Sequence, residues 1–234
     1  MLMVSHRDLA MLCHQSYDEE GIPNAGDPIG AWGPMVFVLA AADCATVVFR
    51  GTIDRGGKLL DLLAAQIRAP GVMAGWGRVH AGFLEAWNAV SRQVRVKTAG
   101  RRVTLTGHSL GGAMATLAAI EMGPQVEAVV TFGSPRVGDA EFRAGYSMQV
   151  PHTTRYVNCL DPVALIPGLI MGWRHVCPAT WYDGSGWCSG YSIGAVLRAA
   201  WHLCGTWEGM LARLADYHRI EAYVAAMPAR ESMV

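Results

Sequence analysis

The sequence has little charge and no excess of either sign. Lysine and arginine together number 19, aspartate and glutamate also number 19, and charged residues make up only 16% of the 234 residues. Binding to nucleic acid needs a basic surface that neutralises phosphates, so no nucleic-acid partner is expected. The 52% share of hydrophobic residues predicts a large buried core and argues against disorder. The length suits one domain, and we expect a single domain over residues 1–234.

Long apolar runs and closely paired cysteines are also missing. No run of 18 apolar residues occurs, so we expect no transmembrane helix. His6, Arg7 and Asp8 interrupt the N-terminal segment, which therefore does not read as a signal peptide and favours a cytoplasmic location. Secretion by another route, or after removal of a leader, would leave no trace in this segment. The six cysteines contain no C-x-x-C pair, which argues against zinc-ribbon and thioredoxin-like sites. Buried free thiols are the simpler interpretation, and a Cys177–Cys188 disulfide is the alternative.

Strand and helix patterns alternate along the chain, which predicts an α/β fold. Helical patterns cover 5–17, 57–69, 83–99, 110–121 and 214–227, and β-rich patterns cover 35–50, 103–106, 126–132 and 153–160. The 35–50 segment breaks near Asp43 and is expected to form a hairpin. This alternation predicts a mostly parallel central sheet with helices on both faces. Residues 181–214 are less regular, and we expect an irregular or helical cap insertion there.

A serine stands between glycines where a strand pattern becomes a helix pattern. The segment "GHSLG" at 107–111 matches G-x-S-x-G, a motif that needs a strand before it and a helix after it. Gly107 and Gly111 remove side chains that would collide in so sharp a turn. The motif predicts that Ser109 is a nucleophile. The alternative is a glycine-rich helix start with Ser109 as its N-cap, but an N-cap does not need glycine on both sides.

An activated serine needs a histidine base and a carboxylate that holds it, here expected in the order serine, acid, base. Asp161 follows the apolar strand pattern at 156–160 and starts a loop, the place where ligands collect in α/β sheets. Asp139 reads as a helix cap instead. Three histidines follow Asp161. His218 is favoured as the base, whereas His175 reads as structural and His202 sits among large apolar residues.

Seven segments together resemble the class-three (fungal-type) lipases of the α/β-hydrolase fold. They lie in the order of that family and are "VVFRGT" (47–52), "VHAGF" (79–83), "LTGHSLGGAMATLAA" (105–119), "VVTFGSPRVGD" (129–139), "YVNCLDPVALIP" (156–167), "RHVC" (174–177) and "YHRIEAY" (217–223). The resemblance implies an α/β-hydrolase fold and a Ser109–His218–Asp161 catalytic triad. It also implies that Thr52 and Leu110 form the oxyanion hole, and that His80, His108 and His175 are not the base.

The expected activity is hydrolysis of carboxylic esters through an acyl-enzyme. The resemblance implies acyl-lipid substrates of the triacylglycerol lipase type. A phospholipase A-type or small-ester esterase is the alternative, and a lipase-like scaffold that binds without turnover is the alternative outside enzymes. No metal, cofactor or obligate protein partner is expected. The base must be neutral in the free enzyme, so activity is expected to rise between roughly pH 6 and 8.

Two apolar segments are candidates for contact with lipid. The first, at 162–173, follows Asp161 and either lines the acyl site, touches a lipid surface or forms a buried loop. The second, at 193–207, has the pattern of an amphipathic helix, which suits a transient membrane contact or an ordinary packed helix. The lid of the resembled family would follow Thr52, and residues 71–77 are a candidate for a small flap.

Overall fold

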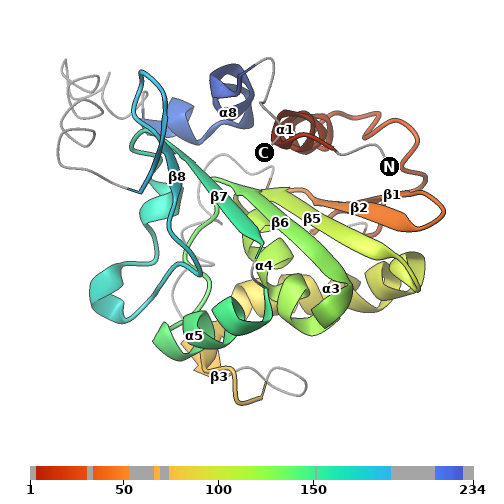
Figure 1. Cartoon of the computed structure of the whole chain (residues 1–234), viewed down its shortest axis with the longest axis horizontal. Helices are drawn as coiled ribbons and strands as arrows, with labels where there is room; N and C mark the ends of the chain where they lie inside the picture. Colours follow the sequence, from red (N-terminus) through yellow and green to blue (C-terminus); the bar gives the residue numbers. More distant parts are fainter. Residues whose placement is uncertain are drawn as a thin grey trace.

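The chain folds around one twisted sheet of seven strands, in the order β1-β2-β5-β6-β7-β8-β9 (Figure 1). The structure is a computed structural model, and it describes residues 4–30, 34–52, 66–68, 74–150, 152–190 and 214–228. The strands are β1 (Val36–Ala40), β2 (Cys44–Phe49), β5 (Arg102–His108), β6 (Val126–Phe132), β7 (Thr153–Asn158), β8 (Thr180–Tyr182) and β9 (Trp187–Ser189). A separate pair consists of β3 (Gln66–Arg68) and β4 (Arg78–His80).

The centre of the sheet is parallel and its edges are antiparallel. Strands β2, β5, β6, β7 and β8 run parallel to one another, whereas the edge strands β1 and β9 pair antiparallel with β2 and β8. The hairpin expected around Asp43 is β1–β2. The strands expected near 103–106, 126–132 and 153–160 are β5, β6 and β7. The predicted α/β-hydrolase fold with a mostly parallel sheet is therefore confirmed.

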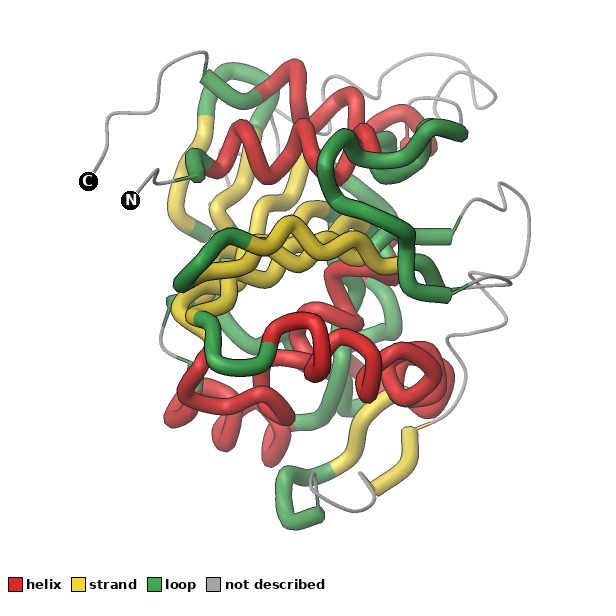
Figure 2. Tube along the Cα trace, turned by 90° about the vertical axis from the view of Figure 1, so that its right-hand side faces the viewer, coloured by secondary structure: helices red, strands yellow, loops and turns green. Residues whose placement is uncertain are grey.

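Helices cover both faces of the sheet, as Figure 2 shows edge-on. One face carries α3 (Ala81–Thr98), α4 (Leu110–Met122) and α5 (Ala140–Gln149). Helix α4 is buried along almost its whole length, because its run of alanines and glycines has no polar face. Asp139 caps α5 by accepting from the amide of Phe142, as predicted. This face holds the larger of the hydrophobic cores, in which Trp87 and Phe49 pack edge to face.

The other face is covered by the first and last described helices, α1 (His6–Gln15) and α8 (Ile220–Ala226), which pack against each other (Figure 1). Helix α1 follows an N-cap at Ser5, in which Ser5 and Asp8 hydrogen-bond each other's backbone. Arg7 donates to the carbonyl oxygens of Val224 and Met227 and so ties α1 to the end of the chain. This layer brings two distant parts of the sequence to the same side of the sheet.

Several short segments complete the fold, and some of them differ from the sequence-based expectation. Short 3-10 turns lie at η2 (Gly123–Gln125), η3 (Val163–Leu165) and η4 (Leu169–Met171). Residues 181–190, expected as the start of a cap insertion, instead extend the central sheet as β8 and β9. Residues 191–213, the rest of that expected insertion, lie outside the described residues. The helix pattern at 214–227 is broken at Arg219, which lies between a helical turn at 214–218 and α8.

The helix expected over 57–69 is also wrong at its end, because residues 66–68 pair with β4 as a strand. Tertiary pairing overrides a weak local pattern there, and residues 53–65 lie outside the described part. The alternative of a Cys177–Cys188 disulfide is wrong as well, because both thiols are free. Each instead donates to a backbone carbonyl, that of Thr153 for Cys177 and that of Trp181 for Cys188.

Candidate active site

Ser109 sits at the sharp turn between β5 and α4, in a backbone conformation that side chains rarely adopt. Its φ is 59° and its ψ is −127°, and it makes no N-cap hydrogen bond, so the N-cap alternative does not hold. A Cβ at Gly107 would lie 2.4 Å from the carbonyl of Gly111, and a Cβ at Gly111 would lie 2.0 Å from the Phe49 oxygen. Glycine is therefore required on both sides before the serine can be held in this strained turn.

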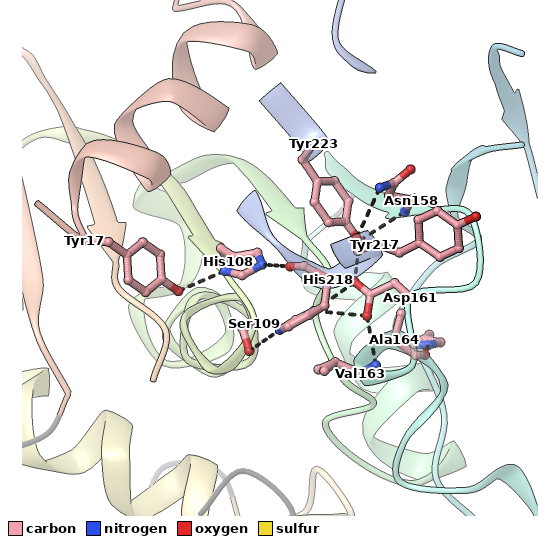
Figure 3. Close-up of polar contacts among 11 residues, drawn as sticks. Tyr17, His108, Ser109, Asn158, Asp161, Val163, Ala164, Tyr217, His218 and Tyr223 are labelled. Carbon is pink, nitrogen blue, oxygen red and sulfur yellow. Dashed lines mark hydrogen bonds and ion pairs between the residues drawn. The ribbon is translucent and has the colours of Figure 1, made fainter. Parts of the chain in front are cut away.

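Three side chains from distant parts of the chain meet beside this turn in an unbroken series of hydrogen bonds (Figure 3). The Oγ of Ser109 lies 2.9 Å from Nε2 of His218. The Nδ1 of His218 lies 2.9 Å from Oδ2 and 3.0 Å from Oδ1 of Asp161. The three residues come from the β5–α4 turn, the helical turn before α8 and the loop after β7. This is the order in which a base takes a proton from a hydroxyl while a carboxylate holds the base.

Asp161 is fully buried, and each of its oxygens accepts a hydrogen bond from another donor besides His218. The hydroxyl of Tyr223 donates to Oδ2 at 2.6 Å, and the amide of Val163 donates to Oδ1 at 2.9 Å. A buried carboxylate is costly unless its oxygens are satisfied in this way. The His218 side chain keeps 19% of its surface exposed, so the base reaches solvent while the acid does not.

Gly133 makes the space in which the acid and the base meet. Its φ is +57°, and a Cβ there would lie 2.6 Å from Oδ2 of Asp161 and 3.1 Å from Nδ1 of His218. The same atom would lie 3.1 Å from the hydroxyl of Tyr223. Any side chain at this position would separate the acid from its partners. Gly133 lies in the quoted segment 129–139, but no function was predicted for it. Its neighbours in the sequence do not indicate which side chains lie beside it in the fold.

Three other histidines, His80, His108 and His175, contact groups other than Ser109. The Nε2 of His175 donates to the Ala164 carbonyl oxygen at 2.7 Å. Burial, followed by the charge of Arg155, holds the pKa of His175 well below its usual value. His80 caps α3 by accepting from the amide of Gly82, and burial lowers its pKa to about 4. His108 points away from Ser109 and contacts Tyr17 and the carbonyl of His218 (Figure 3). His202 lies outside the described residues.

The end of β2 packs directly against the serine turn, which brings Thr52 close to it. A Cβ at Gly51 would lie 3.1 Å from the Cβ of Ser109 and 2.7 Å from the His108 oxygen. The Thr52 hydroxyl is buried and has no hydrogen-bond partner among the described residues. Leu110, the first residue of α4, is buried at 7% exposure, and amides of a first helical turn have no partner within the helix. Both predicted oxyanion residues therefore lie beside the turn that carries Ser109.

The segment after Asp161 is buried at one end and exposed at the other. Val163 and Ala164 are buried, whereas Leu165, Ile170 and Met171 are exposed by 43%, 104% and 60%. Arg136 fastens this segment by donating to the carbonyl oxygens of Leu165 and Pro167. Of the three roles considered for 162–173, a wholly buried loop is therefore wrong. Residues 193–207, the second apolar segment, lie outside the described part.

Comparison with known proteins identifies the family. A model of the family "Lipase (class 3)" matches residues 46–171. This range is more than half of the chain and includes both Ser109 and Asp161. The chain belongs to the class 3 lipases. The resemblance seen in the sequence segments is thereby confirmed.

This class 3 lipase chain is similar to several known proteins, among them two curated relatives and one solved structure. Secreted mono- and diacylglycerol lipase 1 of Fusarium solani is 37% identical over 135 residues, which cover 53% of this chain and 40% of the relative. Phospholipase A1 EG1 of Oryza sativa subsp. indica is 38% identical over 106 residues, which cover 38% of this chain and 24% of the relative. The native propeptide complex of Rhizomucor miehei lipase superposes with a TM-score of 0.63 at 26% identity, covering 77% of this chain and 68% of that one. The chain thus spans less than half the length of these curated relatives.

The relatives correct the expected cytoplasmic location. The Fusarium solani protein is named as a secreted lipase, which points to an extracellular rather than a cytoplasmic location for members of this kind. The expectation was wrong because an interrupted apolar N-terminus reports only on a signal peptide, not on the compartment. Within the described residues, no helix is long and apolar enough to cross a membrane.

Proposed function

We propose that this class 3 lipase chain hydrolyses carboxylic esters of acyl lipids, with Ser109 as nucleophile, His218 as base and Asp161 as acid. The observation that carries the proposal is the unbroken path from Ser109 Oγ through His218 to Asp161, with contacts of 2.9 Å on each side of the imidazole. A serine hydroxyl is a weak nucleophile, and a neutral imidazole at this distance activates it by taking its proton.

The reaction proceeds in two acyl transfers. Ser109 Oγ attacks the ester carbonyl while His218 Nε2 takes its proton, and the carbonyl oxygen becomes an oxyanion. The backbone amides of Thr52 and Leu110, together with the Thr52 hydroxyl, hold that oxyanion, an effect worth about 3–4 kcal/mol for each such donor. His218 then gives the proton to the leaving alcohol, and the C–O bond of the ester breaks. Water attacks the acyl-enzyme with the same base and releases the fatty acid and free Ser109.

The acyl-lipid substrate class is supported by the relatives and by the exposed apolar segment beside the acid. Leu165, Ile170 and Met171 present apolar surface on the segment that begins at Asp161. A transient contact of this segment with a lipid surface would bring substrate to the site, because burying apolar surface is favourable. A phospholipase A-type activity is the second candidate, favoured by the likeness to a relative named as a phospholipase A1.

Hydrolysis of a p-nitrophenyl ester series from acetyl to palmitoyl tests this proposal. Ser109→Ala and His218→Ala are expected to lose at least about a thousandfold in kcat, while His175→Ala keeps activity if it folds. Thermal unfolding of each variant separates loss of chemistry from loss of structure. An active His218→Ala together with a folded but inactive His175→Ala would overturn the assigned base. Release of fatty acid from phosphatidylcholine vesicles but not from a triacylglycerol emulsion would favour the second candidate.

A further inference from the structure

Tyr17, near the N-terminal end of the sequence, places a partly buried hydroxyl beside the serine turn. It directly follows the C-cap of α1, and its hydroxyl lies 2.9 Å from Nδ1 of His108 (Figure 3). The backbone of Gly51 lies against the same oxygen. A Cβ at Gly51 would lie 2.3 Å from that oxygen, so only glycine lets the strand end approach it. Tyr17 therefore joins the β2 end to the serine turn.

His108 continues the connection to the base. Its Nε2 lies 2.6 Å from the backbone oxygen of His218. A carbonyl oxygen only accepts, so Nε2 carries the proton, and Nδ1 accepts from the Tyr17 hydroxyl. Both imidazole nitrogens are thus used, and their direction is fixed. The series runs from the Gly51 backbone through Tyr17 and His108 to His218.

We propose that Tyr17 and His108 are positioning residues that set the spacing between the oxyanion backbone and the base. This inference rests on the proposed function. Gly51 precedes Thr52, the proposed oxyanion donor, and His218 is the proposed base. One series of contacts, the close approach of Gly51 to Tyr17 and the two hydrogen bonds of His108, fixes both relative to Ser109, which follows His108 directly. Such spacing matters because a displacement of about 1 Å in reacting groups costs as much as a hundredfold in rate.

The electrostatic setting keeps this series unchanged during the reaction. Burial, followed by the charge of nearby His218, holds the pKa of His108 well below its usual value. His108 therefore stays neutral when His218 takes the serine proton. Burial also raises the pKa of Tyr17, so its hydroxyl keeps the proton that it donates to His108. No member of the series changes its donor or acceptor role as charge develops on the base.

Tyr17→Phe tests the proposal, with Tyr146→Phe as the matched control. Tyr146 likewise has a partly buried hydroxyl contact, at 2.9 Å from Thr153 Oγ1, and it lies in α5 on the other face of the sheet. Both substitutions remove one hydroxyl with a hydrogen bond of equal length. With soluble p-nitrophenyl butyrate, Tyr17→Phe is expected to lower kcat about 10- to 100-fold with KM changed less than about twofold. Tyr146→Phe is expected to leave both constants within about twofold of wild type.

Two further variants separate the two halves of the series and serve if Tyr17→Phe fails to fold. His108→Gln keeps a donor toward the His218 carbonyl but loses the acceptor for Tyr17, whereas His108→Asn keeps the acceptor and loses the donor. Both are expected to lower kcat. Combining Tyr17→Phe with His108→Gln is expected to cost less than the product of the two single effects, because they interrupt the same series.

The possible results distinguish failure of the positioning role from failure of the proposed function. If the wild type hydrolyses the ester, and kcat of Tyr17→Phe and of both His108 variants stays within twofold of the wild-type value, the positioning role is overturned. The proposed function then still stands. Equal losses in Tyr17→Phe and Tyr146→Phe, or losses that multiply in the double variant, also overturn it. A folded wild type that hydrolyses no ester overturns the proposed function, and the positioning role falls with it.

Discussion

The hydroxyl of Tyr223 donates a 2.6 Å hydrogen bond to Oδ2 of Asp161, the oxygen that also faces His218 at 2.9 Å. The same hydroxyl accepts from the amide of Asn158. Helix α8 therefore supports the acid from one side while the helical turn just before it supplies the base. Tyr223 is itself fully buried, which excludes water as a ready substitute for its hydroxyl.

Tyr223→Phe is expected to weaken both folding and turnover. The variant leaves the Asp161 oxygen and the Asn158 amide without a shared partner, and an unsatisfied buried group costs about 1–3 kcal/mol of folding free energy. A less firmly held carboxylate also orients His218 less well, so kcat is expected to fall about tenfold. Urea unfolding and ester hydrolysis measure the two effects. Tyr182→Phe is the control, because its hydroxyl makes only a 3.4 Å surface contact; equal behaviour of the two variants would contradict the role given to Tyr223.

Gly133→Ala is expected to abolish activity for a steric reason. The new methyl group would lie 2.6 Å from Oδ2 of Asp161, so the acid must move away from His218. Gly100→Ala is the matched control, because Gly100 also has a positive φ, +72°, but has open space around its position. Both variants carry similar backbone strain. Ester hydrolysis is expected to fall at least about a hundredfold in Gly133→Ala only, and parallel losses in both would contradict the steric explanation.

Thr52→Val is expected to lower activity without lowering stability. The Thr52 hydroxyl is buried without a partner among the described residues, and replacing an unsatisfied hydroxyl by a methyl group is neutral or stabilising. If that hydroxyl helps to hold the oxyanion, kcat falls by about 10- to 1000-fold. Thr131→Val is the control, since the Thr131 hydroxyl is buried in the same unpartnered way within β6. A Thr52→Val variant with unchanged kcat would restrict the role of Thr52 to its backbone.

Stability is expected to fall in mild acid. Burial lowers the pKa of His80 to about 4 and holds the pKa of His108 and of His175 well below the usual value. The unfolded chain therefore takes up protons below about pH 6.5 that the folded chain does not, which removes up to about 1.4 kcal/mol per pH unit for each histidine. This loss begins near pH 6.5 and for His80 ends near pH 4.

Urea unfolding at pH 7.5, 6 and 5 measures this loss. His175→Gln is expected to reduce the slope of stability against pH, whereas His152→Gln, a change at an exposed position, is expected to leave the slope unchanged. Constant stability between pH 7.5 and 5 would show that these imidazoles are not held neutral in the folded protein.

The sequence predicted those parts of the fold and of the candidate site whose signal is local. The elbow glycines and the apolar strands are visible within a few residues of sequence. Ser109 and Asp161 lie in the region that the family model matches, and His218 lies in the quoted segment 217–223. The prediction of a helix through 66–68 was wrong, and so was the start of the cap insertion predicted over 181–214. In both places pairing with other strands determines the structure of a short segment.

Tyr17, Gly133 and Tyr223 show what local patterns cannot reveal. Tyr17 meets His108 across 91 positions, and Tyr223 meets Asp161 across 62. Nothing near either tyrosine in the sequence indicates these contacts, although Tyr223 does lie in the quoted segment 217–223. The need for glycine at 133 arises only once three side chains from elsewhere have filled the space beside it.

The central claim is that His218 and Asp161 turn the Ser109 hydroxyl into a nucleophile. Reaction with a fluorophosphonate probe, followed by mass spectrometry of the peptides, tests this most directly. We expect one adduct, on Ser109, that is absent in Ser109→Ala and forms at least about a hundredfold more slowly in His218→Ala. A folded wild-type protein that takes up no probe, or takes it up on another residue, would contradict the account.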